Sequence, residues 1–253
     1  MLIPRVMPCL LLKNGALVKT VRFKDPGYIG DPINAVRIYN EKEVDELIFL
    51  DITATLENRQ PPFDVLAQIA SECFMPVAYG GGIRNLAEIE TVLRIGIEKI
   101  ALNSCAFENP QFVRSAADKF GSQAIVVSID VRKKAFGRYE VFTRAGRKGI
   151  GLDPVKYAAQ MVEAGAGEIL LTAIDRDGTQ EGYDLELIRS VTSAVDIPVI
   201  VCGGAGKVAD FGAAVKQAGA SACAAGSLVV YFGRNRAVLI NFPDRRELEQ
   251  VLL

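Results

Sequence analysis

The chain has 253 residues, half of them hydrophobic, and a formal net charge of −1. Charges of both signs are interspersed along it, which excludes a basic nucleic-acid-binding face and favours a small-molecule ligand. No apolar run reaches the roughly 20 residues that a membrane-spanning helix needs, so we expect no membrane segment.

The side-chain inventory limits both the compartment and the chemistry. The sequence has five cysteines and no histidine. The cysteines are odd in number and lack the spacing of metal ligands, which favours a reducing cytoplasm. Without histidine, acid–base chemistry has to use carboxylates, Lys, Tyr or Cys. We expect a cytoplasmic protein with no metal site and no cofactor.

Short apolar runs of strand length alternate with amphipathic stretches of helix length along the chain. This alternation is typical of βα units with a parallel sheet. The predicted strands are Val6–Leu12, Glu46–Asp51, Val77–Tyr79, Lys99–Leu102, Ala124–Asp130, Glu168–Ala173, Val199–Cys202 and Ala222–Gly226. The predicted helices are Asp31–Lys42, Phe63–Cys73, Leu86–Ile95, Pro110–Phe120, Pro154–Ala164, Asp184–Ala194, Val208–Ala218 and Asp244–Leu253. We therefore predict one (β/α)₈ barrel domain of the TIM type over residues 1–253.

The two halves of the chain resemble each other. Pro76 and Gly81–Gly82 recur as Pro198 and Gly203–Gly204, so positions 76 and 81 are each repeated 122 residues later. This spacing is close to half the chain, as a doubled half-barrel predicts. The first strand is not followed by G-x-G-x-x-G, which argues against an open doubly wound sheet.

Glycines and small polar residues follow several predicted strands, where a barrel of this type has its active site. Glycine leaves backbone N–H groups accessible to an anion, and a neighbouring hydroxyl or amide adds a donor. The first candidate phosphate cradle comprises Gly82, Asn103 and Ser104. The second comprises Asp177, Gly178, Gly204, Ala225, Gly226 and Ser227. Two cradles predict a substrate with a phosphate at each end; the alternative is that the glycines only permit tight turns.

Several stretches resemble the cyclase subunit of imidazole glycerol phosphate synthase between residue 4 and about residue 230. They are MPCLLLKNG, ELIFLDITA, YGGGI, FGSQAIVVSID, GAGEILLTAIDRDGT and CGGAGK. The resemblance implies a barrel that receives ammonia from a glutaminase subunit bound to its bottom face. It also implies a lyase-type reaction that closes an imidazole ring on a bis-phosphorylated substrate in histidine biosynthesis.

The same resemblance implies a catalytic pair of aspartates at the ends of strands one and five. Asp130 keeps the strand-five carboxylate, but Leu11 occupies the strand-one position. A leucine cannot transfer a proton, so the pair is lost. Whether Leu11 merely lines the barrel or marks a redirected reaction stays open. Other family positions at the mouth are retained, and they are Lys19, Asp51 and Thr172.

Four charged residues stand at the beginnings of predicted strands, close to the expected barrel axis. They are Arg5, Glu46, Lys99 and Glu168, and we expect them to form salt bridges that plug the bottom of the barrel. In the family that the chain resembles, this ring gates the entry of ammonia. A purely structural plug is the alternative.

A retained gate, retained cradles and a lost carboxylate together resemble the cyclase-like paralogues found with surface-polysaccharide genes. Our leading hypothesis is a synthase subunit of a glutamine amidotransferase complex that pairs with a separate glutaminase and serves lipopolysaccharide amidino-sugar synthesis. The first alternative is a histidine-pathway cyclase that forms imidazole glycerol phosphate and aminoimidazole carboxamide ribotide. The second is a non-catalytic ammonia conduit or scaffold.

Overall fold

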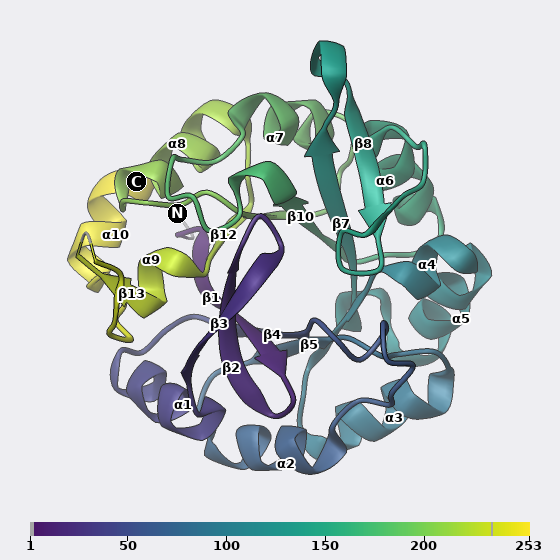
Figure 1. Ribbon diagram of the computed structural model, residues 1–253. Helices are drawn as coiled ribbons and strands as arrows, with labels where there is room; N and C mark the ends of the chain where they lie inside the picture. Colours follow the sequence, from purple (N-terminus) through teal and green to yellow (C-terminus); the bar gives the residue numbers. More distant parts are fainter. Residues whose placement is uncertain (1–2, 234) are drawn as a thin grey trace.

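Parallel strands form a closed ring around the centre of the molecule in the computed structural model, which describes residues 3–233 and 235–253 (Figure 1). Neighbours around the ring follow chain order, and pairing of β10 with β7 closes it. The barrel strands are β1 (Arg5–Lys13), β4 (Leu47–Asp51), β5 (Val77–Gly80), β6 (Lys99–Leu102), β7 (Ile125–Lys133), β10 (Glu168–Ala173), β11 (Val199–Cys202) and β12 (Ala222–Ala225). The predicted (β/α)₈ barrel is confirmed.

Helices between the strands surround this ring (Figure 1). They are α1 (Pro32–Glu41), α2 (Phe63–Glu72), α3 (Leu86–Ile95), α5 (Pro110–Phe120), α6 (Pro154–Glu163), α7 (Leu185–Thr192), α8 (Ala209–Ala218) and α10 (Arg245–Leu252). Four predicted helices begin one residue too early, because their first predicted residues are N-caps. In three of them the cap is an aspartate, Asp31, Asp184 or Asp244, whose carboxylate accepts from backbone N–H groups of the first turn; in the fourth it is Val208.

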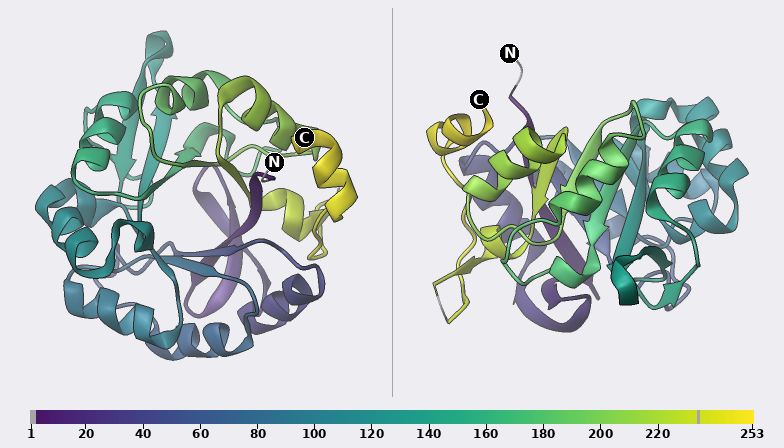
Figure 2. Two further views of the ribbon diagram at one scale, coloured as in Figure 1. Left: turned by 180° about the vertical axis from the view of Figure 1, so that it is seen from behind. Right: turned by 90° about the horizontal axis from the view of Figure 1, so that it is seen from above.

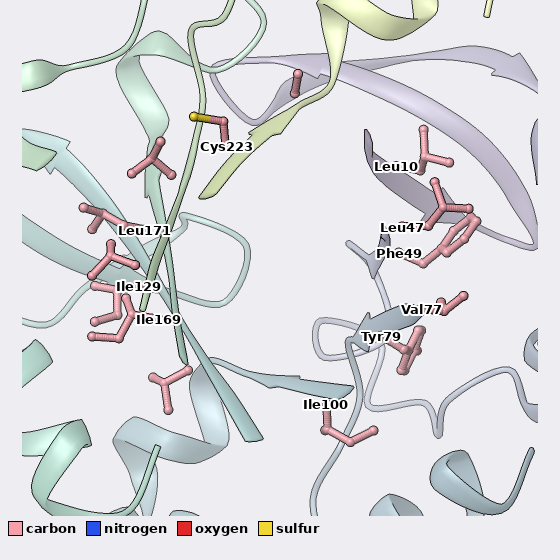
Figure 3. Close-up of a cluster of buried hydrophobic side chains, with 14 of the residues drawn as sticks. Leu10, Leu47, Phe49, Val77, Tyr79, Ile100, Ile129, Ile169, Leu171 and Cys223 are labelled. Carbon is pink, nitrogen blue, oxygen red and sulfur yellow. The ribbon is translucent and has the colours of Figure 1, made fainter. Parts of the chain in front are cut away.

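Successive side chains of each barrel strand point to opposite faces of the sheet, so the apolar side chains form two layers. Side chains such as Leu10, Phe49 and Tyr79 point out from the strands and pack beneath the helices (Figure 3). The alternate residues point into the barrel, because successive side chains of a strand face opposite ways. Met7 and Cys9 belong to this inner cluster. Leu11, two residues further along β1, therefore faces the inside at the mouth of the barrel.

Two hairpins that the sequence did not predict extend from the mouth side of the barrel. The first joins β2 (Ala16–Val21) to β3 (Lys24–Gly30) and lies in front of the mouth in Figure 1. The second joins β7 to β8 (Tyr139–Thr143), which also pairs with β9 (Lys148–Gly149). The expected end of strand five at Asp130 is thus wrong: β7 continues to Lys133 because its last residues pair with β8.

Shorter elements complete the chain. They are α4 (Ser104–Glu108), α9 (Ser227–Val230), β13 (Tyr231–Phe232), β14 (Ala237–Val238) and the 3₁₀ turns η1 (Ser122–Ala124), η2 (Ala135–Gly137) and η3 (Ile174–Arg176). Both chain ends lie at the end of the barrel opposite to the β2–β3 hairpin (Figure 2, right). No helix among the described residues is long and apolar enough to cross a membrane.

The repeated glycines occupy equivalent places in the two halves. Gly81 has a φ of 125° and Gly203 a φ of 90°. A Cβ on Gly81 would lie 2.6 Å from the backbone oxygen of Asp51, and one on Gly203 would lie 2.7 Å from that of Ala173. Both distances are shorter than a Cβ tolerates, so each glycine lets its strand end pack against the end of a neighbouring strand.

Candidate functional site

A cavity of about 320 Å³ opens at the carboxyl ends of the barrel strands. The β2–β3 hairpin contributes Lys19, Thr20 and Phe23 to its wall. Every residue that the sequence predicts for the mouth lines this one cavity, namely Leu11, Lys19, Asp51, Gly82, Asn103, Ser104, Asp130, Thr172, Asp177, Gly178, Gly204, Ala225, Gly226 and Ser227. The mouth of the barrel is therefore the candidate active site.

Asp130 has the properties of a general acid or base. Its side chain is buried, and in the described part of the chain its one hydrogen bond comes from Asn103 Nδ2 at 3.2 Å. Burial raises the pKa of Asp130 to about 7, and the charge of Asp177 adds to the increase, whereas the Asn103 hydrogen bond opposes it. A carboxyl with this pKa exchanges its proton near neutral pH, as acid–base catalysis requires.

This raised pKa makes stability depend on pH. The folded protein holds the Asp130 proton up to about pH 7, whereas the unfolded chain releases it near pH 3.8. The carboxyl therefore lowers the free energy of unfolding progressively as the pH rises between these values. We expect Asp130→Asn to match the wild type near pH 4 and to be more stable by about 4 kcal/mol at pH 8. Urea unfolding at both pH values measures the difference, and an equal difference at both would refute the raised pKa.

The other mouth carboxylates are occupied by structural contacts. Asp51 accepts from the backbone N–H groups of Thr53 at 3.0 Å and Ala54 at 2.9 Å. Asp177 accepts from Lys19 Nζ and from the Thr20 hydroxyl, both at 2.8 Å. These contacts hold the turn after β4 and attach the β2–β3 hairpin to η3. Neither carboxylate is free to replace a missing catalytic partner.

Leu11 and Asp130 line the mouth from opposite sides. Around the closed ring, β1 and β7 are separated by β4, β5 and β6 on one side and by β10, β11 and β12 on the other. Nearby, Cys9 is no substitute base: a hydrogen bond with Cys202 and burial raise the pKa of the Cys9 thiol, so it stays protonated. Among the described residues that line the cavity, Asp130 is thus the one buried carboxyl whose side chain makes no ion pair and no contact with a backbone N–H.

In the first cradle, protein groups already use the predicted donors. Asn103 Nδ2 donates to the Ser128 carbonyl at 3.0 Å as well as to Asp130. The Ser104 hydroxyl donates to Asn103 Oδ1 at 3.3 Å and accepts from the backbone N–H of Arg144 at 3.0 Å. Sequence reasoning missed Arg144, which lies on the unpredicted β8–β9 turn.

In the second cradle, one polar group has no hydrogen-bond partner among the described residues. It is the buried hydroxyl of Ser227. Gly226 precedes it, and a Cβ on this glycine would lie 2.7 Å from Lys19 Cε. The glycine thus leaves room for the lysine side chain. A buried hydroxyl without a partner fits an oxygen of a bound ligand.

The four charged residues at the opposite end of the barrel form a closed ring of ion pairs. Arg5 contacts both Glu46 and Glu168. Lys99 Nζ lies 3.2 Å from Glu46 Oε2 and 2.9 Å from Glu168 Oε2. Glu46 stands one residue before β4, and the other three are the first residues of their strands. The predicted interlocking of these charges is present.

The protein is a (β/α)₈ barrel with a candidate active site at its mouth and a ring of ion pairs at the opposite end. A family model described as "Histidine biosynthesis protein" matches residues 5–235. The chain therefore belongs to this family.

Three relatives are similar over nearly the whole chain. A Pseudomonas aeruginosa protein named "Putative imidazole glycerol phosphate synthase subunit hisF2" is 51% identical over 245 residues, covering 97% of this chain and 98% of the relative. A Leptospira interrogans protein named "Putative imidazole glycerol phosphate synthase subunit HisF" is 48% identical over 250 residues, covering 98% of each chain. A Vibrio vulnificus protein with the corresponding hisF3 name is 45% identical over 253 residues, covering 100% of this chain and 97% of the relative. Within the family, the chain is HisF-like.

Proposed function

We propose that the chain is the cyclase-type subunit of a glutamine amidotransferase complex, with ammonia entering at the bottom of the barrel and an anionic substrate bound at the mouth. The observation that carries the proposal is the combination of a closed charge ring at one end with a buried, titrating Asp130 at the other. The proposed biological role is surface-polysaccharide amidino-sugar synthesis. Its support is that Leu11 stands where the resemblance implies a second catalytic aspartate, and that the other buried carboxylates among the described mouth residues, Asp51 and Asp177, are held by structural contacts.

Side chains of the inner cluster lie between the two ends of the barrel. Small side chains line part of the interior, namely Ala78, Ala101, Ala222 and Ala224. In the proposed reaction, ammonia passes the charge ring and this interior and reaches the substrate beside Asp130. The Asp130 carboxylate then accepts a proton from the attacking nitrogen, and its raised pKa allows the acid form to return that proton to the leaving oxygen or nitrogen.

The proposal predicts that a glutaminase subunit binds the bottom face. Phe74 follows α2 on the bottom side of the barrel, and its side chain is 88% exposed. We expect Phe74→Ala to weaken the complex about tenfold or more, because exposed aromatic residues carry much of the energy of an interface. Phe136, 99% exposed at the tip of the β7–β8 hairpin on the mouth side, is the matched control.

Titration of each variant with a candidate glutaminase subunit from the same organism measures this affinity. Phe136→Ala should bind like the wild type. Substitution at Glu98 is unsuitable, because its carboxylate accepts from the Val77 N–H at 2.7 Å and thus supports the fold. No association of the wild type at micromolar concentration would contradict the proposed complex.

One alternative function is supported by a specific observation. The mouth retains Asp130, Lys19 and both glycine pairs in one cavity, which also fits a histidine-pathway cyclase. The scaffold alternative lacks such support. Among the described residues the buried hydroxyl of Ser227 has no partner, which fits a mouth that binds a ligand better than one that has lost its ligand. Turnover of the histidine-pathway substrate separates the first alternative from the proposal.

A further inference from the structure

The turn between β8 and β9 has an unusual backbone. Arg144, Ala145 and Gly146 are consecutive left-handed residues with φ of 54°, 52° and 73°. The Arg147 N–H donates to the carbonyls of Thr143 and Arg144, each at 3.2 Å. Residues with a Cβ disfavour this conformation, so it persists only where the surroundings hold it in place, often at functional sites.

Contacts from two other elements hold the turn. The Arg144 N–H donates to the Ser104 hydroxyl of the first cradle at 3.0 Å. On the other side, Gly146 packs against the β2–β3 hairpin and η3: a Cβ there would lie 2.8 Å from Phe23 Cδ2 in the hairpin and 3.3 Å from Ile174 Cδ1 in η3. The turn therefore lies between the first cradle and the hairpin and contacts both.

This placement brings two guanidinium groups to the mouth. Arg144 and Arg147 both line the cavity, and the Arg144 N–H contacts Ser104. The side chain of Arg144 is 56% exposed, and its nearest carboxylate, Glu108, is 3.9 Å away. Within residues 3–233 and 235–253, the Arg147 side chain has no hydrogen-bond or ion-pair partner. The donors of both groups are thus available to a ligand.

We propose that Arg144 and Arg147 bind a phosphate monoester group of the substrate at the first cradle. The Asn103 and Ser104 side chains already donate to protein acceptors there, so the two arginines supply the missing donors. A guanidinium group presents N–H pairs that match two phosphate oxygens. This inference rests on the proposed function for the phosphate of the substrate, but the site itself is tested with inorganic phosphate.

The test is calorimetric titration with inorganic phosphate at low ionic strength. We expect the wild type to bind two phosphates. The double variant Arg144→Gln/Arg147→Gln should weaken one site tenfold or more and leave the other unchanged. Glutamine keeps the Cβ and the Arg144 N–H contact with Ser104, so the turn is preserved. Arg138→Gln is the control, because Arg138 is exposed near the tip of the β7–β8 hairpin and lies outside the cavity.

Each contrary result has a distinct meaning. Two unchanged sites in the double variant would overturn the role of the arginines and leave the proposed function intact. Equal weakening by Arg138→Gln would also overturn it, because the effect would then be general charge. A wild type that binds no phosphate would overturn this inference together with the two-phosphate part of the proposed function.

Discussion

Replacing Leu11 with aspartate is expected to raise cyclase activity by about 10²–10⁴-fold, the usual contribution of one general acid or base. The assay uses ammonium salts and the bis-phosphorylated histidine-pathway precursor. The new carboxylate would face Asp130 across the mouth, because β1 and β7 are opposite strands of the ring. It would thus restore a second proton-transferring group that Asp51 and Asp177, held by their own contacts, cannot provide.

Leu11→Asn is the matched control for this variant. Asparagine has nearly the size and shape of aspartate but transfers no proton, so activity should stay at the wild-type level. Leu11 is only 9% exposed, and we expect either substitution to cost about 2–4 kcal/mol of stability. Urea unfolding of both variants shows that they are folded under the assay conditions. A folded Leu11→Asp without a gain would mean that the second carboxylate is not what the mouth lacks.

The second large effect is expected at the charge ring. Removing the guanidinium with Arg5→Met leaves Glu46, whose side chain is 2% exposed, and Glu168 with Lys99 as their remaining cation. One half-buried cation compensates two carboxylates poorly, so we expect a loss of about 3 kcal/mol in the free energy of unfolding. The double variant Arg5→Met/Glu46→Gln, which removes one charge of each sign, should recover much of this loss.

An exposed ion pair provides the comparison for the ring. Arg37 pairs with Glu72 at 2.8 Å, but its side chain is 57% exposed. Water screens such a pair, so Arg37→Met should cost less than about 1 kcal/mol. Urea unfolding at pH 7 measures all three variants. If Arg5→Met cost no more than Arg37→Met, the ring would be a solvated surface cluster and not a buried plug.

The barrel was predictable because its strands are buried on both faces. Val199–Cys202 is a continuous apolar run and Glu168–Ala173 contains one, Ile169–Leu171, and the structure has the predicted bounds of both strands. The hairpins were not predictable in the same way. Residues 131–133 read Val-Arg-Lys, a charged extension typical of a loop, yet pairing with β8 outside the barrel keeps them in a strand.

The candidate site was predictable in its members but not in their contacts. The rule that strand ends meet at the mouth was sufficient to bring Asp130, Asn103 and Ser227 into one cavity. The hydrogen bond from Arg144 to Ser104 joins loops 40 residues apart and depends on a left-handed arginine. Backbone propensity disfavours that conformation, so no local pattern predicts it.

The turnover number of the wild-type chain with saturating ammonium salts and the bis-phosphorylated histidine-pathway precursor tests the account most directly. Among the described residues of the mouth, Asp130 is the one buried carboxyl that no ion pair or backbone N–H holds, so we expect the precursor to bind and product formation to stay near the uncatalysed background. Turnover at about 1 s⁻¹ or faster, the usual range of enzymes, would contradict the account and identify the chain as a histidine-pathway cyclase that functions with Leu11 in place.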